Sequence, residues 1–280
     1  MDELQRWRRH NPMSDPGAGP LGFDGLPADV TALCRVVQGV LIHSDWIAAY
    51  GASEAEFQTV SRETLPLAAR LGQIGEADPR PLALERATYK RAVGTCRDYA
   101  LMLCGMLRQQ GVPARVRCGF ATYFRKEWED HWICEYWRDG HWNKADAQLD
   151  KVIAPRLDID FDPADLPDGK FITAGEAWRR CRSGEADPAI FGHGEAATGL
   201  WFVRVNVVRD HHSLNGRETS EWDTWRQATA AHRVLSEAEC LQADGIAAHP
   251  EAPIDAAPVQ PLVPPWSRAE EAARQGGMYS

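Results

Sequence analysis

Three residues of the types that make up a nucleophilic triad follow one another along the chain: Cys96, His131 and Asp146. A cysteine thiolate can attack an acyl carbonyl when a nearby histidine takes the thiol proton and later passes it to the leaving group. The histidine in turn needs a third group, commonly a carboxylate, that fixes its tautomer and its orientation. These residues could therefore support covalent catalysis through a thioester, provided that the fold brings them together.

Cys96 stands at the start of a segment whose apolar residues recur at helical spacing until Gly111. Thr95 is a favourable N-cap and Asp98 occupies the third helical position, so the sequence predicts a helix over about 96–110. The unpaired amides and the positive dipole end of a helix N-terminus favour a thiolate over a thiol. The same amides can hold the oxyanion of a tetrahedral intermediate.

His131 opens a predicted strand over residues 131–138, and the turn signal Asp139-Gly140 leads into a returning strand that carries Asp146. Antiparallel pairing through this turn places the start of the first strand beside the end of the second. A base and the carboxylate that orients it require this proximity, so the hairpin favours a pair of His131 and Asp146.

Two other residues could fill the same roles. His141 is the rival base, but it follows the turn directly and is expected to be exposed to solvent. Asp150 is the rival carboxylate. Several other cysteines fit the pattern of small core hydrophobes instead; these are Cys34, Cys104, Cys118 and Cys134.

Four short segments together resemble the transglutaminase-like superfamily; they are Gly94 to Ala100, Gly111 to Arg115, His131 to Glu135, and Trp142 to Asp146. In that family a cysteine begins a helix, a Gly-x-Pro-Ala-Arg turn leads into a strand, and a histidine and an aspartate follow on adjacent strands. Carried over position by position, the resemblance makes Cys96 the nucleophile, His131 the base and Asp146 the residue that orients the base.

The resemblance implies an α+β fold with a papain-like, transglutaminase-like core, in which the helix carrying the nucleophilic cysteine packs on an antiparallel sheet. It implies a cysteine-dependent enzyme without a cofactor that forms or hydrolyses amides through a thioester on Cys96. The substrate would be a peptide, an amide or a small acyl donor, with water or an amine as acceptor. The alternative is a catalytically inactive binding module of the same fold. Two departures concern substrate placement: Trp132 follows the histidine directly, and Ala147 stands where the family often has proline.

Four residues are predicted to bind substrate. Glu135 should share a strand face with His131, from which it is four residues removed. Trp132 belongs to a group of tryptophans around the hairpin that could form the wall of a cleft. Trp46 and Tyr89 are the candidates for an oxyanion-hole side chain.

Composition narrows the classes of function. Of 280 residues, 44% are hydrophobic and 25% are charged, which is typical of a globular protein able to bury a sizeable core. The net charge of −9 argues against general affinity for nucleic acid or anionic membranes. The sequence shows no apolar stretch near about 18 residues and no secretory leader. Seven irregularly spaced cysteines without a C-x-x-C pair predict free thiols, no metal site and a cytoplasmic location.

The pattern of prolines and glycines suggests three regions. Residues 1–25 are predicted to be a flexible lead-in, residues 26–246 the catalytic domain, and residues 247–280 a tail rich in proline and alanine. Within the domain, Leu200 to Val208 has the strongest strand character, and Ser236 is expected to cap a short helix.

Overall fold

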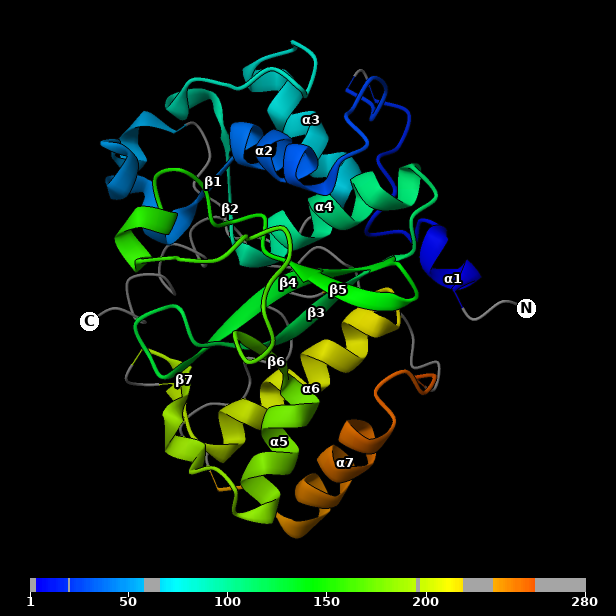
Figure 1. Cartoon of the computed structure of the whole chain (residues 1–280), viewed down its shortest axis with the longest axis vertical. Coiled ribbons are helices and arrows are strands. Elements are labelled where there is room, and N and C mark those ends of the chain that lie inside the picture. Colours follow the sequence, from blue (N-terminus) through cyan, green and yellow to red (C-terminus); the bar gives the residue numbers. More distant parts are fainter. Residues whose placement is uncertain (1–3, 20, 58–65, 195–196, 219–233, 255–280) are drawn as a thin grey trace.

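A sheet lies between two groups of helices in the computed structural model (Figure 1). The structure describes residues 4–19, 21–57, 66–194, 197–218 and 234–254. The helices are α1 (Gln5–Arg8), α2 (Val30–Val40), α3 (Leu67–Ala77), α4 (Cys96–Gln109), α5 (Ala174–Ser183), α6 (Leu200–Leu214) and α7 (Glu237–Ala248). The strands are β1 (Leu41–His43), β2 (Ala92–Gly94), β3 (Ala114–Ala121), β4 (Trp128–Arg138), β5 (His141–Ala145), β6 (Phe171–Thr173), β7 (Phe191–His193) and β8 (Ala197–Thr198).

The main sheet is built around the long strand β4. The strand order is β6-β3-β4-β7-β8, and β5 also pairs with β4. Strand β3 runs antiparallel to β4 along its whole length, whereas β7 joins the start of β4 in parallel, at Trp128 and Glu129. Strand β5 returns antiparallel along the other end of β4, and β1 and β2 form a separate parallel pair.

The predicted hairpin between β4 and β5 is confirmed. Asp139 and Gly140 have φ of 55° and 85°, the left-handed values that a two-residue turn between twisted strands requires. The last registered pair is Cys134 with Ala145, so Asp146 follows directly on the end of β5.

Helices cover both faces of the sheet (Figure 1). Helix α4 packs on β3 and β4 with α2 beside it, and Leu33, Leu103 and Val116 belong to the core on this side. Helix α6 packs along β3, where its Asp210 accepts a hydrogen bond from the Cys118 amide at 2.9 Å, and it is covered by α5 and α7. The predicted α+β class, with the Cys96 helix packed on a mainly antiparallel sheet, is confirmed. The second helical layer was not predicted.

The strand predicted for Leu200 to Val208 is wrong, because these residues form the first part of α6. The helix buries ten of its 15 residues, so apolar side chains are needed around most of its circumference. A nearly continuous apolar run results, and such a run does not distinguish a buried helix from a buried strand. The β-branched valines strengthened the strand interpretation, but packing in the hydrophobic core around α6 overrides that weak preference.

The described part of the predicted lead-in, residues 1–25, belongs to the folded body. Trp7 and Met13 are buried, and the Trp7 ring packs edge-on against Trp142 at 6.3 Å between centroids. The Met13 carbonyl accepts a hydrogen bond from the Leu67 amide at 2.7 Å. Prolines and glycines here mark turns within a packed segment, so the prediction of a flexible lead-in is corrected.

Helix α7 begins as predicted, because the Ser236 side chain accepts a hydrogen bond from the backbone of its third helical residue. The helix continues to Ala248, past the expected boundary at 246. Glu251 then forms an ion pair with Arg115 at 2.7 Å. The rest of the predicted tail, residues 255–280, lies outside the described residues. Within the described part of the chain, none of the helices is long and apolar enough to cross a membrane.

Candidate active site

Cys96 is the first residue of α4 and is half-buried. Thr95 caps the helix in an extended conformation, and its backbone amide donates to an Asp98 carboxylate oxygen at 2.8 Å. Gly94 favours this close approach, because a Cβ at this position would lie only 3.0 Å from the Asp98 side chain. The local sequence thus holds the thiol at a well-defined helix N-terminus.

Asp98 also anchors this helix end to its neighbours. Its carboxylate pairs with Arg70 and Arg97, each at 3.0 Å. Burial alone would raise the pKa of Asp98, but the charges of these two arginines hold the pKa below its ordinary value. Arg70 also donates to the Val93 carbonyl in β2 at 2.7 Å. The ionised carboxylate therefore ties α3, β2 and α4 together beneath Cys96.

His131 and Asp146 meet as the hairpin predicts. The His131 Nε2 lies 2.8 Å from the Asp146 Oδ2, and the two residues are 2% and 1% exposed. The Tyr123 hydroxyl donates to the same oxygen at 2.8 Å. Burial and the charge of Asp146 raise the pKa of Tyr123 well above its ordinary value, so the phenol remains a donor. The Gln148 amide donates to the other oxygen, Oδ1, at 2.9 Å, so the carboxylate is fixed from both sides.

The contact with Asp146 determines which nitrogen of His131 is available for chemistry. Because Nε2 is bonded to the carboxylate, Nδ1 is the ring nitrogen left to exchange a proton with a thiol. The rings of Phe124 and Tyr123 flank the imidazole, with centroids 4.7 Å and 5.9 Å away. The packing restricts rotation of the ring.

Cys96 and His131 line the same cleft, which has a volume of about 1000 Å³. The short 3-10 helix Ser44–Tyr50 contributes to one part of the wall, and the loop that follows β3 contributes Phe124 to another. Asp146 lies behind His131 and is buried. The fold therefore places the thiol and the imidazole on one cavity, with the orienting carboxylate behind the imidazole.

The tryptophans predicted to bind substrate both line this cleft. Trp132 is buried, and the Arg209 guanidinium lies 5.4 Å from its ring. Trp46 lies on the 3-10 helix, with Arg125 at 5.7 Å from its ring. Tyr89, by contrast, is 57% exposed and is not among the residues of the cleft. Its prediction as an oxyanion-hole residue is therefore corrected.

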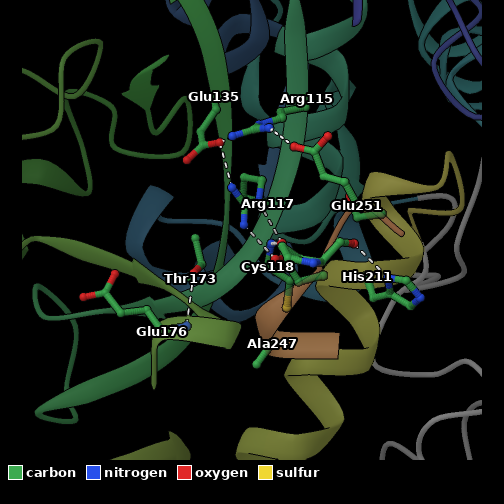
Figure 2. A network of polar contacts seen from close by, with 12 residues as sticks. Arg115, Arg117, Cys118, Glu135, Thr173, Glu176, His211, Ala247 and Glu251 are labelled. Atoms are coloured by element: carbon green, nitrogen blue, oxygen red, sulfur yellow. Dashed lines mark hydrogen bonds and ion pairs between the residues drawn. The ribbon is translucent and has the colours of Figure 1, made fainter. Parts of the chain in front are cut away.

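Glu135 is also outside the cleft and belongs to a buried ion-pair network (Figure 2). The β3–β4 register places Arg115 opposite it, and Arg115 and Arg117 contact its carboxylate at 2.7 and 2.9 Å. Burial alone would raise the pKa of Glu135, but the two arginines hold it below its ordinary value. Its predicted role in substrate binding is wrong, because the carboxylate is held by β3.

The rival triad residues are placed elsewhere. His141 is exposed, and its Nδ1 lies 3.3 Å from the Asp139 carbonyl. The Asp150 carboxylate accepts hydrogen bonds from the Tyr50 hydroxyl at 2.7 Å and from the Val152 amide at 2.8 Å, so it is fixed to the turn that follows it. Neither side chain contacts the His131–Asp146 pair.

All seven cysteines are free thiols. The four predicted to be core residues are buried, namely Cys34, Cys104, Cys118 and Cys134. Cys181 and Cys240 are half-buried like Cys96, but neither lines the cleft.

Sequence reasoning missed several residues of the site. Tyr123 and Phe124 follow β3 in a loop, and nothing in their spacing indicated that they would flank the imidazole. Gln148 could have been noticed from the sequence only through its position two residues after Asp146. His193 reaches the cleft from β7, where its Nδ1 lies 3.2 Å from Asp130. These contacts arise only when distant segments pack together.

Residues 75–147 match the model of the transglutaminase-like superfamily, a segment that contains all three predicted triad residues. The match confirms the resemblance and supports the general expectation of a cysteine-dependent enzyme. No curated protein matches the chain significantly. One similar solved structure is a proposed cysteine protease from Cytophaga hutchinsonii, with 15% sequence identity and a TM-score of 0.33. The match covers 56% of this chain and 45% of that protein, and likeness at this level carries no weight for activity.

Proposed function

We propose that this chain, which carries a transglutaminase-like core over residues 75–147, is a cysteine-dependent acyl-transfer enzyme with Cys96 as its nucleophile. One observation carries the proposal. The His131 Nε2 lies 2.8 Å from Asp146, and His131 shares a cleft with Cys96 at the start of α4. A merely structural histidine would not need a carboxylate behind it and a thiol on the same cavity.

The first half-reaction would form a thioester. The Cys96 thiol gives its proton to the His131 Nδ1, and the sulfur attacks the carbonyl carbon of an amide. A sulfur–carbon bond forms, and the carbonyl electron pair moves onto the oxygen. When that pair returns, the carbon–nitrogen bond breaks, and the leaving nitrogen takes the proton from His131. Asp146 keeps the imidazole oriented and stabilises its charged form throughout.

The second half-reaction would release the acyl group. Water or an amine gives a proton to the His131 Nδ1 and attacks the thioester carbonyl, and the sulfur leaves as a thiolate. Water yields an acid, so the enzyme would be an amidase or peptidase. An amine yields a new amide, so the enzyme would be a transglutaminase-like transferase. A cleft of about 1000 Å³ has room for an acyl donor and an acceptor together.

The test is mass spectrometry of the intact protein after incubation with p-nitrophenyl acetate, an activated acyl donor. We expect one acetyl group on Cys96 and none on the variant Cys96→Ala. His131→Ala should slow the acylation nearly as much, because the members of a triad act as a unit. His141→Ala is the matched control, and it should react as the wild type does.

Three results would contradict the proposal. Acetylation that persists at an unchanged rate in Cys96→Ala would mean that the nucleophile lies elsewhere. Acylation that His141→Ala removes and His131→Ala leaves intact would refute the choice of base. A folded wild type that acquires no acetyl group would favour the inactive binding module. Adding a primary amine to the acylated enzyme, and analysing whether an amide or an acid forms, distinguishes transferase from hydrolase.

A further inference from the structure

Gln148 lines the cleft together with Cys96 and His131, although the residue is only 2% exposed. Its carboxamide oxygen, Oε1, is buried without a hydrogen-bond partner. The carboxamide nitrogen likewise makes no hydrogen bond with any residue that the structure describes. A buried amide next to a triad therefore has its full hydrogen-bonding capacity unused.

The backbone of Gln148 is held firmly. Its amide donates to the Asp146 Oδ1 at 2.9 Å, and its carbonyl accepts from the Asp150 amide at 2.9 Å. The residue thus follows the carboxylate that orients His131 and is bonded to it. The backbone of Gln148 is therefore fixed beside the cleft.

The isolation of this carboxamide is unusual within the molecule. Other buried polar atoms without a partner occur among the described residues, but each belongs to a side chain with another atom that is bonded. Arg70, for example, has an unpaired Nε but bonds through both terminal nitrogens. Among these residues, Gln148 alone has a side chain without any hydrogen bond. Burying such a group is unfavourable, so proteins rarely keep one without a ligand to satisfy it.

We propose that the Gln148 carboxamide donates a hydrogen bond to the acyl oxygen of the substrate. This inference rests on the proposed function, because attack by the Cys96 sulfur places negative charge on that oxygen. An amide NH₂ is a neutral donor, and rotation about the last side-chain bond can turn the nitrogen toward the oxygen. Gln148 would then complete an oxyanion site with the backbone amides at the start of α4.

The experiment compares two reactions of Cys96 in the variant Gln148→Met, which removes the donor and keeps the volume. Acylation by p-nitrophenyl acetate passes through an oxyanion, whereas alkylation by iodoacetamide displaces iodide from a saturated carbon and forms none. We expect acylation to slow on the order of 100-fold and alkylation to keep its rate. The melting temperature should rise by about 2–4 °C, because an unpaired buried amide is gone.

The matched control is Gln38→Met. Gln38 lines a smaller cavity of about 340 Å³, and its carboxamide donates to the Leu149 carbonyl at 3.3 Å, on the residue after Gln148. This variant disturbs the same loop but should leave acylation unchanged. If Gln148→Met does not fold, Gln148→Glu keeps the shape, removes both donors and should slow acylation in the same way.

Each outcome is decisive. Acylation of Gln148→Met at the wild-type rate would overturn the inference while the proposed function stands. An equal loss of acylation and alkylation would overturn it too, because Gln148 would then support the thiolate instead of the oxyanion. If Trp46→Phe slows acylation and Gln148→Met does not, the oxyanion donor would be the Trp46 indole. A wild type whose Cys96 reacts with neither reagent would overturn the proposed function itself.

Discussion

The seven cysteines of this chain allow a competition experiment in which six thiols serve as internal controls. The perturbation is a substoichiometric dose of iodoacetamide at about pH 6. The thiolate is the species that reacts, so labelling follows the thiolate fraction and the access of each cysteine. We expect Cys96 to be labelled first, because it stands at a helix N-terminus and lines a cleft that also holds His131.

The size of the margin follows from the structure. Burial raises the pKa of Cys118 well above its ordinary value and raises the pKa of Cys181 to about 11. At pH 6 a thiol with a pKa of about 11, as for Cys181, is about one part in 10⁵ thiolate. An ordinary cysteine with a pKa of about 8.5 is roughly 0.3% thiolate at pH 6, so even an unshifted exposed thiol would react more than about 10² times faster than Cys181.

Peptide mapping at early times is the assay, applied to the wild type and to His131→Ala. Loss of the imidazole removes the group that takes the thiol proton, so the lead of Cys96 over Cys181 should shrink. His141→Ala should keep the lead, because that side chain is exposed and remote from the cleft. Labelling led by Cys181 or Cys240, with Cys96 silent in the folded protein, would refute the reasoning.

Three further predictions test the neighbouring parts of the molecule. Asp146→Asn should slow acylation of Cys96 less than His131→Ala does, since Asp146 orients the ring without carrying the proton; a single-turnover loss in Asp146→Asn as large as that in His131→Ala would contradict this. Glu135→Ala should lower the free energy of unfolding in urea by about 3–5 kcal/mol, because buried arginines lose their partner, and acylation should not change. Because the pKa of Glu135 is lowered in the folded state, its contribution is complete above the ordinary carboxyl pKa of about 4.3, and it is lost as the pH falls through the folded value; the variant should lack this pH dependence. Deleting residues 1–20 should lower the melting temperature by roughly 10 °C, since Trp7 and Met13 are buried, and an unchanged melting temperature would show that this packing contributes little.

The features predicted correctly from the sequence are those with local determinants. The cap at Thr95 and the apolar spacing of the following turns define the helix of Cys96 within about fifteen residues. The turn at Asp139 and Gly140 fixes the β4–β5 register, and with it the approach of His131 to Asp146. Short-range chemistry was therefore sufficient to place the pair.

The errors concern features that depend on distant contacts. A helix buried around most of its circumference has no polar face, so α6 had no amphipathic pattern to recognise. The face that Glu135 shares with His131 was inferred correctly from strand alternation. The arginines of β3 that hold its carboxylate depend on a strand register that the sequence did not fix. Similarly, the burial of Trp7 depends on Trp142 and Arg115, more than 100 residues away.

Asp146 connects the predicted chemistry to the inferred oxyanion site. Its Oδ2 accepts from His131 and Tyr123, and its Oδ1 accepts from the Gln148 amide. One carboxylate thus orients the base with one oxygen and fixes the loop of the proposed acyl-oxygen donor with the other. An asparagine at this position has a single oxygen, so it can satisfy only one of these two sets of donors. If it keeps His131 in place, its NH₂ faces the Gln148 amide, two donors oppose each other, and the loop must shift. Asp146→Asn should therefore slow acylation of Cys96 more than it slows alkylation, and equal losses in both reactions would show that Asp146 acts through the histidine alone.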